Sequence, residues 1–375
     1  MDLFVARDEL GRGLARIQGI IERRGMQPLL SHVLMAASEG QLRMTATDTE
    51  IAFIGDLEAT VKEPGDIAVD AANLFQIVRA LPEPTVQLSL TENSRLLIKC
   101  GRSEFKLPGY PAEEFPALPA FDAKGSAKIS EGVLRRMVEQ TAFAVAVEDV
   151  RYGLNGAHLE EVEENGQRHL RVVTTDGHRL SASQGAVAGD VMLMPKMLVP
   201  KKALGVLRKL LDNDDNEVEV SFGDGAIRLD RPAQRVWFRL LDGEFPDYKG
   251  VLPSDHKHRV LVRRADLAAT LKRVGILVQD KGRSGGRAVR FAFGATDLEI
   301  DVHDVDRGEV RESVPIELDG EPIEIGFNAR YLGEVLQAMS GERVSLELAH
   351  ALAPCLVRDP DDPAAFFVVM PMRLD

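Results

Sequence analysis

One pattern of apolar and basic positions recurs three times along the chain. In residues 199–211, Leu204, Leu207 and Leu211 recur at helical spacing, and basic residues occupy the opposite side. The same apolar spacing returns in two other segments, as Leu74, Ile77 and Leu81 and as Leu332, Val335 and Met339. The copies are about 130 residues apart, which predicts a single unit used three times.

A second helix and several strands are predicted around each copy. Apolar stripes place the further helices within residues 8–21, 128–145 and 259–278. Alternating apolar and polar residues in the intervening segments predict antiparallel strands. Four prolines between residues 108 and 119 indicate an extended connector near residue 125. We expect an α+β protein of three similar domains, 1–125, 126–255 and 256–375, each with two helices and antiparallel sheets.

Charge is unevenly distributed along the sequence. The net charge is −13, and an acidic surface repels nucleic-acid phosphates. The basic residues nevertheless gather on predicted helices, while carboxylates concentrate in loops such as 160–165 and 212–217. Arg12 and Arg16 form a basic stripe on the first predicted helix. A basic surface that accepts DNA and ordinary solvated helix faces are both consistent with these clusters.

Cysteine content and hydropathy bear on cofactors and location. The two cysteines, Cys100 and Cys355, lie far apart without metal-ligand spacing, so no disulfide framework, zinc site or other cofactor is expected. The first ten residues are too charged for a signal peptide, and no segment approaches eighteen apolar residues. We expect a cytoplasmic protein with no membrane partner.

Asp176 and His178 deserve consideration as a catalytic pair, because a histidine oriented by an aspartate is a common general base. No nucleophile motif, recurring pair of carboxylates or phosphate-binding loop accompanies them. The Asp-Gly sequence is typical of a turn, which would direct His178 and Arg179 outward. We expect the chain not to be an enzyme, with a hydrolase built on this pair as the alternative.

Several local sequences together resemble the family of bacterial DNA polymerase III beta subunits, the sliding clamps of the replisome. They occur in the family's order and spacing over essentially the whole chain. They are DVRYGLNG (149–156), VTTDGHRL (173–180), LVPKKAL (198–204), GEFPDYKGVLP (243–253), EIGFNARYL (324–332) and VVMPMRL (368–374).

The resemblance implies the DNA clamp fold and a head-to-tail homodimer that forms a six-domain ring near the nucleoid. Double-stranded DNA would pass through this ring without sequence readout. The implied protein partners are the DNA polymerase III alpha subunit, the clamp loader, and other polymerases and repair proteins. The basic loop 281–287 matches a DNA-contacting loop of the family. The matching DNA-facing residues are Arg24, Arg151, Tyr152, Lys201 and Lys202, to which the stripe adds Arg12 and Arg16.

The resemblance also implies a hydrophobic cleft between the second and third domains. It would bind short linear peptides that carry a glutamine and large apolar side chains. Methionines would give the cleft a deformable wall. Without the family, residues 368–372 are equally consistent with a closing strand that has an edge proline. The matching residues are Leu154, Thr175, Gly177, His178, Arg179, Leu180, Pro246, Val251, Val368, Val369, Met370, Pro371, Met372 and Arg373.

The implied dimer contact joins a strand edge of the first domain to the end of a helix in the third. The matching residues are Phe105, Leu107, Ile276 and Leu277. The alternative is that all four belong to the cores of their own domains.

The chain departs from the family pattern at four positions, Glu148, Gly153, Gly250 and Asp375. These departures bear on the polarity of the cleft and on one DNA contact. A protein-interaction scaffold that never encircles DNA is a second functional alternative.

Overall fold

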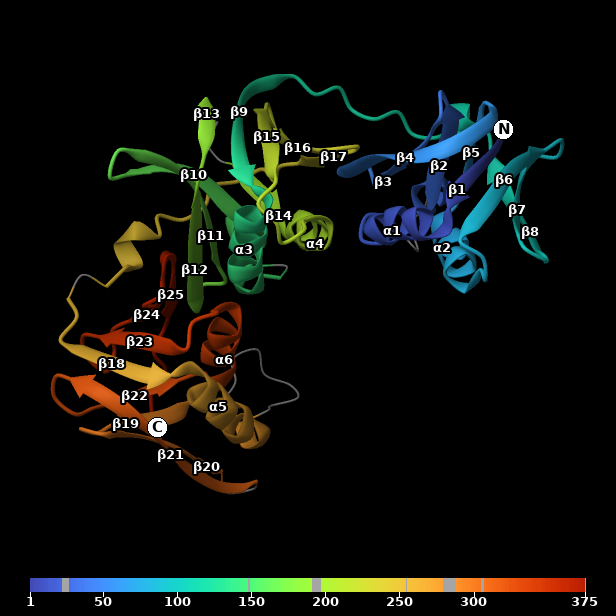
Figure 1. Cartoon of the computed structure of the whole chain (residues 1–375). Helices are drawn as coiled ribbons and strands as arrows, with labels where there is room; N and C mark the ends of the chain where they lie inside the picture. Colours follow the sequence, from blue (N-terminus) through green and yellow to red (C-terminus); the bar gives the residue numbers. More distant parts are fainter. Residues whose placement is uncertain are drawn as a thin grey trace. The chain divides into compact units, whose positions relative to one another are not determined.

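The computed structural model describes residues 1–21, 27–147, 149–190, 197–253, 255–278, 288–304 and 307–374. They form two compact units (Figure 1). The first unit contains Met1–Val133 and Val187–Leu241, and the second contains Leu134–Ala186 and Asp242–Asp375. Within the described ranges, no helix has the length and apolar character needed to cross a bilayer.

The first unit is built on a thirteen-stranded antiparallel sheet in the order β1-β6-β7-β8-β5-β2-β3-β4-β17-β16-β15-β9-β13. Its helices are α1 (Arg7–Ile17), α2 (Ala71–Ala80) and α4 (Lys201–Leu210), with 3-10 turns η1 (Pro28–Ser31) and η2 (Ala112–Glu114). The strands are β1 (Asp2–Ala6), β2 (His32–Ser38), β3 (Gln41–Thr47), β4 (Ile51–Glu63), β5 (Gly65–Asp70), β6 (Thr85–Thr91), β7 (Arg95–Cys100), β8 (Ser103–Tyr110), β9 (Ala123–Ser130), β13 (Ala188–Asp190), β14 (Leu198–Pro200), β15 (Glu217–Gly223), β16 (Ala226–Arg231) and β17 (Gln234–Arg239).

The second unit has its own antiparallel sheet, in the order β10-β11-β12-β25-β24-β23-β18-β21-β20-β19-β22. Its helices are α5 (Arg264–Val278), α6 (Ala329–Ala338) and most of α3 (Glu131–Thr141), with 3-10 turns η3 (Ala142–Ala144), η4 (Tyr152–Asn155) and η5 (Lys249–Val251). The strands are β10 (Gly156–Glu164), β11 (Gln167–Thr175), β12 (Arg179–Ala186), β18 (His258–Arg263), β19 (Val289–Phe293), β20 (Asp297–Asp304), β21 (Gly308–Asp319), β22 (Ile323–Phe327), β23 (Arg343–Leu348), β24 (Cys355–Asp359) and β25 (Asp362–Val369).

Burial and capping explain where the helices lie. The apolar stripe of α1 is fully buried, and Leu204 and Leu207 of α4 are buried as the periodicity predicts. The Asp70 carboxylate caps α2 by accepting the N–H of Asn73 at 2.7 Å, and Asn328 caps α6 in the same way. Helices α1 to α6 lie within the six predicted segments, and the sheets are antiparallel. The predicted α+β class is confirmed.

Strand pairing joins successive repeats inside each unit. β4, the fourth strand of the first repeat, pairs with β17, the last strand of the second. β12, the fourth strand of the second repeat, pairs with β25, the last strand of the third. Each pairing covers a sheet edge with backbone hydrogen bonds. The repeats are therefore joined sheet to sheet, by the same pair of elements each time.

The last strand of a repeat also ends against the strand that precedes the second helix. The Leu241 N–H donates to the Leu198 carbonyl of β14 at 2.9 Å, and the Met372 N–H donates to the Gly326 carbonyl of β22 at 2.8 Å. The end of β8 pairs with β5 in the same manner. This contact fixes where each terminal strand segment lies.

Two strands in the interior of the sheet orders, β8 and β21, each have a stretch with no partner among the described residues, in addition to the end strands β13 and β22. Residues 103–108 of β8 pair with β7 on one side only, and residues 308–315 of β21 pair with β20 on one side only. β8 is the last strand of the first repeat, and β21 is the fourth strand of the third. The two unpaired edges therefore belong to one last strand and one fourth strand, the same two strand types that pair with each other within the chain.

Candidate functional site

The turn between β11 and β12 is the centre of the predicted cleft. The Asp176 carboxylate accepts the N–H groups of His178 and Arg179 at 3.0 and 3.1 Å. The Thr175 hydroxyl donates to the Arg179 carbonyl at 2.6 Å, and Gly177 adopts a positive φ of 86°. Backbone hydrogen bonds to the aspartate and a left-handed third residue make this a tight, fully bonded turn.

The first repeat contains the same turn at the end of β3. Asp48 accepts the N–H groups of Glu50 and Ile51, and the Thr47 hydroxyl donates to the Ile51 carbonyl. Thr49 has a φ of 76°, as Gly177 has 86°. The first and second repeats therefore contain the same turn, with the same side-chain-to-backbone hydrogen bonds.

This geometry argues against the catalytic alternative. Asp176 accepts backbone N–H groups and the Arg179 guanidinium, so its oxygens do not orient the His178 ring. That ring instead stacks on Tyr331, with ring centroids 5.9 Å apart. The pair lacks the hydrogen bond that a general base needs from its orienting carboxylate.

The apolar floor of the predicted cleft is buried and continuous. Leu180 and Val368 pack in one cluster with Val173 and Tyr248, and Phe245 and Leu252 lie against it. Leu154, Val369 and Thr175 are also buried. Residues from β11, β12, β25 and the 243–253 segment are thus brought together within the second unit.

The 243–253 segment forms one side of this floor, with Tyr248 as its anchor. Tyr248 is buried and its hydroxyl donates to Glu160 of β10. Burial, followed by that hydrogen bond, raises the pKa of Tyr248 to about 12. The Phe245 ring stacks on His158 at 5.2 Å. Pro246 and Val251, in the same segment, are exposed.

The terminal segment after β25 bonds to the β11–β12 turn and to β22. The Met370 N–H donates to the His178 carbonyl at 2.9 Å, and Met372 bridges to Gly326. A side chain at Gly326 would overlap the Met372 carbonyl oxygen, so only glycine allows this approach. Met370, Pro371 and Met372 are half-buried, while Arg373 is exposed.

The loop before β10 reaches the turn from the other direction. The Arg151 guanidinium binds Asp149 through two hydrogen bonds of 2.9 and 2.7 Å. These bonds lower the pKa of Asp149 to about 2. Arg151 also lies over Gly177, so a residue predicted to face DNA lies beside one predicted to line the cleft. Gly153 packs against the Glu244 carbonyl, and η4 begins at Tyr152.

Arg179 differs from its predicted role. Its side chain is 6% exposed, and its guanidinium binds Asp176, Glu334 and the Phe143 carbonyl. The expectation that the turn directs Arg179 outward is therefore wrong. Periodicity carries no signal for its partners Phe143 of η3 and Glu334 of α6, because they lie far away in the chain.

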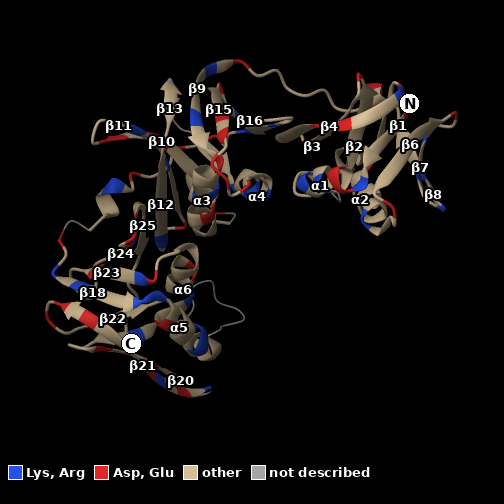
Figure 2. Ribbon diagram, in the orientation of Figure 1, with Lys and Arg blue, Asp and Glu red and all other residues tan. Residues whose placement is uncertain are grey.

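The predicted DNA-facing residues of the first unit differ in their surroundings. Lys202 extends from α4 to bind the Asp48 carboxylate and, at 3.0 Å, the Ile20 carbonyl, so its charge is largely offset. Lys201 is exposed at the start of α4. Figure 2 shows further Lys and Arg residues along α1, α4 and α5. Arg24 and the loop 281–287 lie outside the described residues.

The two arginines of the α1 stripe are also paired. Arg12 is exposed and binds Glu9 one turn earlier in the helix. Arg16 lies 3.5 Å from Asp212, and burial, with repulsion from Arg231, lowers its pKa. Arg16 thus belongs to a half-buried charge cluster between the first two repeats, while Arg12 has an exposed surface position.

The residues predicted for the dimer contact are accessible. Phe105 is 39% exposed on the unpaired part of β8, and Ile276 is 71% exposed near the end of α5. Leu107 and Leu277 are half-buried beside them in sequence. Two of the four are therefore exposed apolar side chains, and none is a fully buried core residue.

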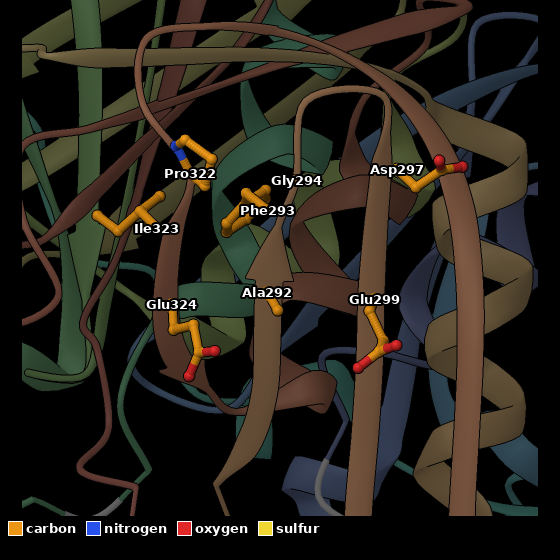
Figure 3. Close-up of a pocket in the computed structure, with 8 residues that line it drawn as sticks. All are labelled: Ala292, Phe293, Gly294, Asp297, Glu299, Pro322, Ile323 and Glu324. Carbon is orange, nitrogen blue, oxygen red and sulfur yellow. The ribbon is translucent and has the colours of Figure 1, made fainter.

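A separate shallow pocket of about 430 Å³ lies on β19, β20 and β22. Figure 3 shows Glu324 and Glu299 on either side of Ala292, with Phe293, Pro322 and Ile323 nearby. None of the predicted cleft residues lines it. The pocket is therefore distinct from the floor built around Leu180 and Val368.

Comparison with known proteins gives matches over the entire chain. Family models described as the N-terminal, central and C-terminal domains of the DNA polymerase III beta subunit match residues 1–119, 128–247 and 249–373. The chain is 34% identical to the beta sliding clamp of Caulobacter vibrioides and 32% identical to that of Escherichia coli, and each match covers 100% of both chains. Among solved structures, a Pseudomonas aeruginosa sliding clamp bound to griselimycin is 34% identical, with a TM-score of 0.91 and complete coverage of both chains.

Proposed function

The chain belongs to the family of DNA polymerase III beta subunits, the beta sliding clamps, and we propose that it closes into a ring around duplex DNA and holds partner proteins in a cleft. It has the three-domain clamp fold and is a non-catalytic processivity subunit, so DNA and DNA polymerase III are its partners. We propose domain boundaries of 1–125, 126–255 and 256–375. A cytoplasmic, nucleoid-associated location follows from the DNA partner.

The observation that carries the ring is the complementarity of the two unpaired strand edges. A fourth strand meets a last strand at β4–β17 and again at β12–β25. The last strand of the first repeat, β8, and the fourth strand of the third repeat, β21, have no such partner among the described residues. A second copy supplies the missing partner for each, so we propose a head-to-tail dimer closed by two β8–β21 pairings.

Exposed apolar side chains support the same contact. Phe105 projects from the unpaired part of β8, and Ile276 lies near the end of α5. The Glu312 carboxylate of β21 binds Arg273 of α5, so that helix lies beside the unpaired strand. We propose that Phe105 and Leu107 of one copy pack against Ile276 and Leu277 of the other.

Duplex DNA is the proposed occupant of the ring. Lys201, Arg208 and Lys209 are exposed on one side of α4, opposite its buried leucines. Such helix faces attract phosphates without reading bases, and salt screens the attraction. Arg12 and Arg151 are exposed enough to contribute, although each already has a carboxylate partner. Weak, non-specific contacts suit a protein that must slide.

The cleft over Leu180 and Val368 is the proposed docking site for the linear motifs of polymerases, the clamp loader and repair proteins. Its floor is apolar, its sides are the 243–253 segment and residues 370–373, and methionines line one side. A crystal structure of a Caulobacter crescentus beta sliding clamp contains polyethylene glycol bound to a putative beta-motif tethering region. A tethering region in a protein 34% identical to this chain supports the proposal.

Retention on DNA of different topology tests the proposal. Purified protein would be incubated with its clamp loader and ATP on nicked circular DNA, and half of each sample linearised. A sliding ring stays on the circle and runs off the linear ends. Equal retention on both forms would instead mean surface binding, and no retention on either would favour the scaffold that never encircles DNA.

A further inference from the structure

Arg179 is a charged residue in a buried position, and each of its three guanidinium nitrogens has a hydrogen-bond partner. Nε donates to Asp176 at 3.1 Å, one terminal nitrogen binds Glu334 of α6, and the other donates to the Phe143 carbonyl at 3.0 Å. A buried guanidinium is tolerated only when its donors are satisfied in this way. Each of the three guanidinium nitrogens of Arg179 thus has a protein partner, and the side chain is only 6% exposed.

Two aromatic rings complete its surroundings. The Phe143 and Tyr331 ring centroids lie 5.0 and 4.6 Å from the guanidinium carbon. Tyr331 also stacks on His178, the exposed residue at the tip of the turn. The Arg179 side chain therefore connects the turn of the second repeat with η3 and with α6 of the third.

The corresponding turn of the first repeat has different residues at the positions of Arg179 and Glu334. Its equivalent turn carries buried Ile51 where the second carries Arg179, and α4 carries buried Val206 where α6 carries Glu334. The joint between the first and second repeats thus has two apolar residues where the joint between the second and third has an arginine and a glutamate. In the first repeat a cation from the following helix, Lys202, binds the turn aspartate instead.

We infer that Arg179 is a positioning residue and that Glu334 is its counter-charge. Together they hold the Thr175–Arg179 turn against α6, and so fix the wall of the cleft without touching the bound peptide. This rests on the proposed function only in taking a peptide as the occupant of the cleft. The link itself is a property of the second unit.

The test variant is Glu334→Gln, because Glu334 is partly exposed and its replacement leaves the other bonds of Arg179 in place. The matched control is Arg330→Gln, which removes the 3.8 Å contact of exposed Arg330 with Glu334 and its cation–π contact with Tyr331 but leaves the Arg179–Glu334 pair in place. The probe is a fluorescein-labelled peptide of about ten residues with one glutamine and two large apolar residues, followed by anisotropy. Amide hydrogen exchange at residues 177–179 is the second readout.

We expect Glu334→Gln to weaken peptide binding three- to tenfold and to speed exchange at residues 177–179, while the control matches the unmodified protein in both. Similar melting temperatures in the two variants would separate this local effect from general destabilisation. Unchanged exchange in Glu334→Gln overturns the inference. So does a loss of binding in Arg179→Gln without any loss in Glu334→Gln, which would make Arg179 a direct ligand contact. If the unmodified protein binds no peptide, the proposed cleft function fails, and the exchange rates alone decide the inference.

Discussion

Replacing Gly326 with alanine should loosen the terminal segment that we assign to one side of the proposed cleft. The new Cβ would overlap the Met372 carbonyl oxygen and lie 3.0 Å from the Leu374 side chain. The segment must move by about 1 Å to restore normal contact. That movement sacrifices the 2.8 Å hydrogen bond between the Met372 N–H and the Gly326 carbonyl. A backbone hydrogen bond contributes about 1 kcal/mol, so peptide affinity should fall about fivefold.

The measurement is anisotropy titration of the labelled peptide with Gly326→Ala, with Gly333→Ala as the matched control. Gly333 is in α6 of the same domain, and a Cβ there meets nothing within 4 Å. The control should therefore keep its peptide affinity and gain up to about 1 kcal/mol of stability from improved helix propensity. If Gly326→Ala binds the peptide within twofold of the control, the terminal segment does not need this bridge to shape the cleft.

Three further outcomes are expected. The Cβ of Gly153→Ala would overlap the Glu244 carbonyl oxygen, so this variant should lower the melting temperature by about 3 °C. Gly205→Ala is the control, because its Cβ meets open space and its melting temperature should not fall. Equal melting temperatures of the two variants would contradict the close packing at Gly153. Phe105→Asp places a charge on the unpaired strand edge and should yield folded monomers by light scattering, and a persisting dimer would remove this edge from the interface. Burial and Glu160 raise the pKa of Tyr248 from 10.0 to about 12, so its contribution to stability is complete below pH 10 and is lost as pH rises towards 12. The difference in urea midpoint between the unmodified protein and Tyr248→Phe should therefore shrink between pH 9 and pH 11.5, and a constant difference would refute this.

Local periodicity was enough to predict the repeated elements. The stripe of Leu204, Leu207 and Leu211 predicts a helix over 199–211, and α4 spans Lys201–Leu210. Alternation likewise finds the strands, because both signals arise from residues a few positions apart. The helix predicted at 8–21 is shorter in the structure, where α1 ends at Ile17 although Ile20 and Ile21 are buried. Burial alone does not distinguish a helix from the turn that follows it.

Charged residues were harder to interpret, because their partners are distant in sequence. Lys202 belongs to a basic helix face by its spacing, yet it binds Asp48 of the preceding repeat. Arg179 lies in a family motif, yet its side chain is enclosed by Phe143, Tyr331 and Glu334. The sequence locates such residues on the correct element. Whether a charge meets solvent, a ligand or another side chain depends on tertiary packing.

The two unpaired strand edges have a consequence for how copies of the chain assemble over time. Each copy brings one edge of β8 and one of β21, and every contact in the proposed ring would use one of each. An open string of any length therefore always ends in one reactive edge of each kind, and only closure leaves none. When a closed ring opens to admit DNA, both edges reappear together, and each can capture a stray copy as readily as its former partner. As the protein concentration rises, an open ring should therefore be captured sooner by another copy and should form longer strings more often. A low concentration of the protein would limit such polymerisation as effectively as a tight interface does.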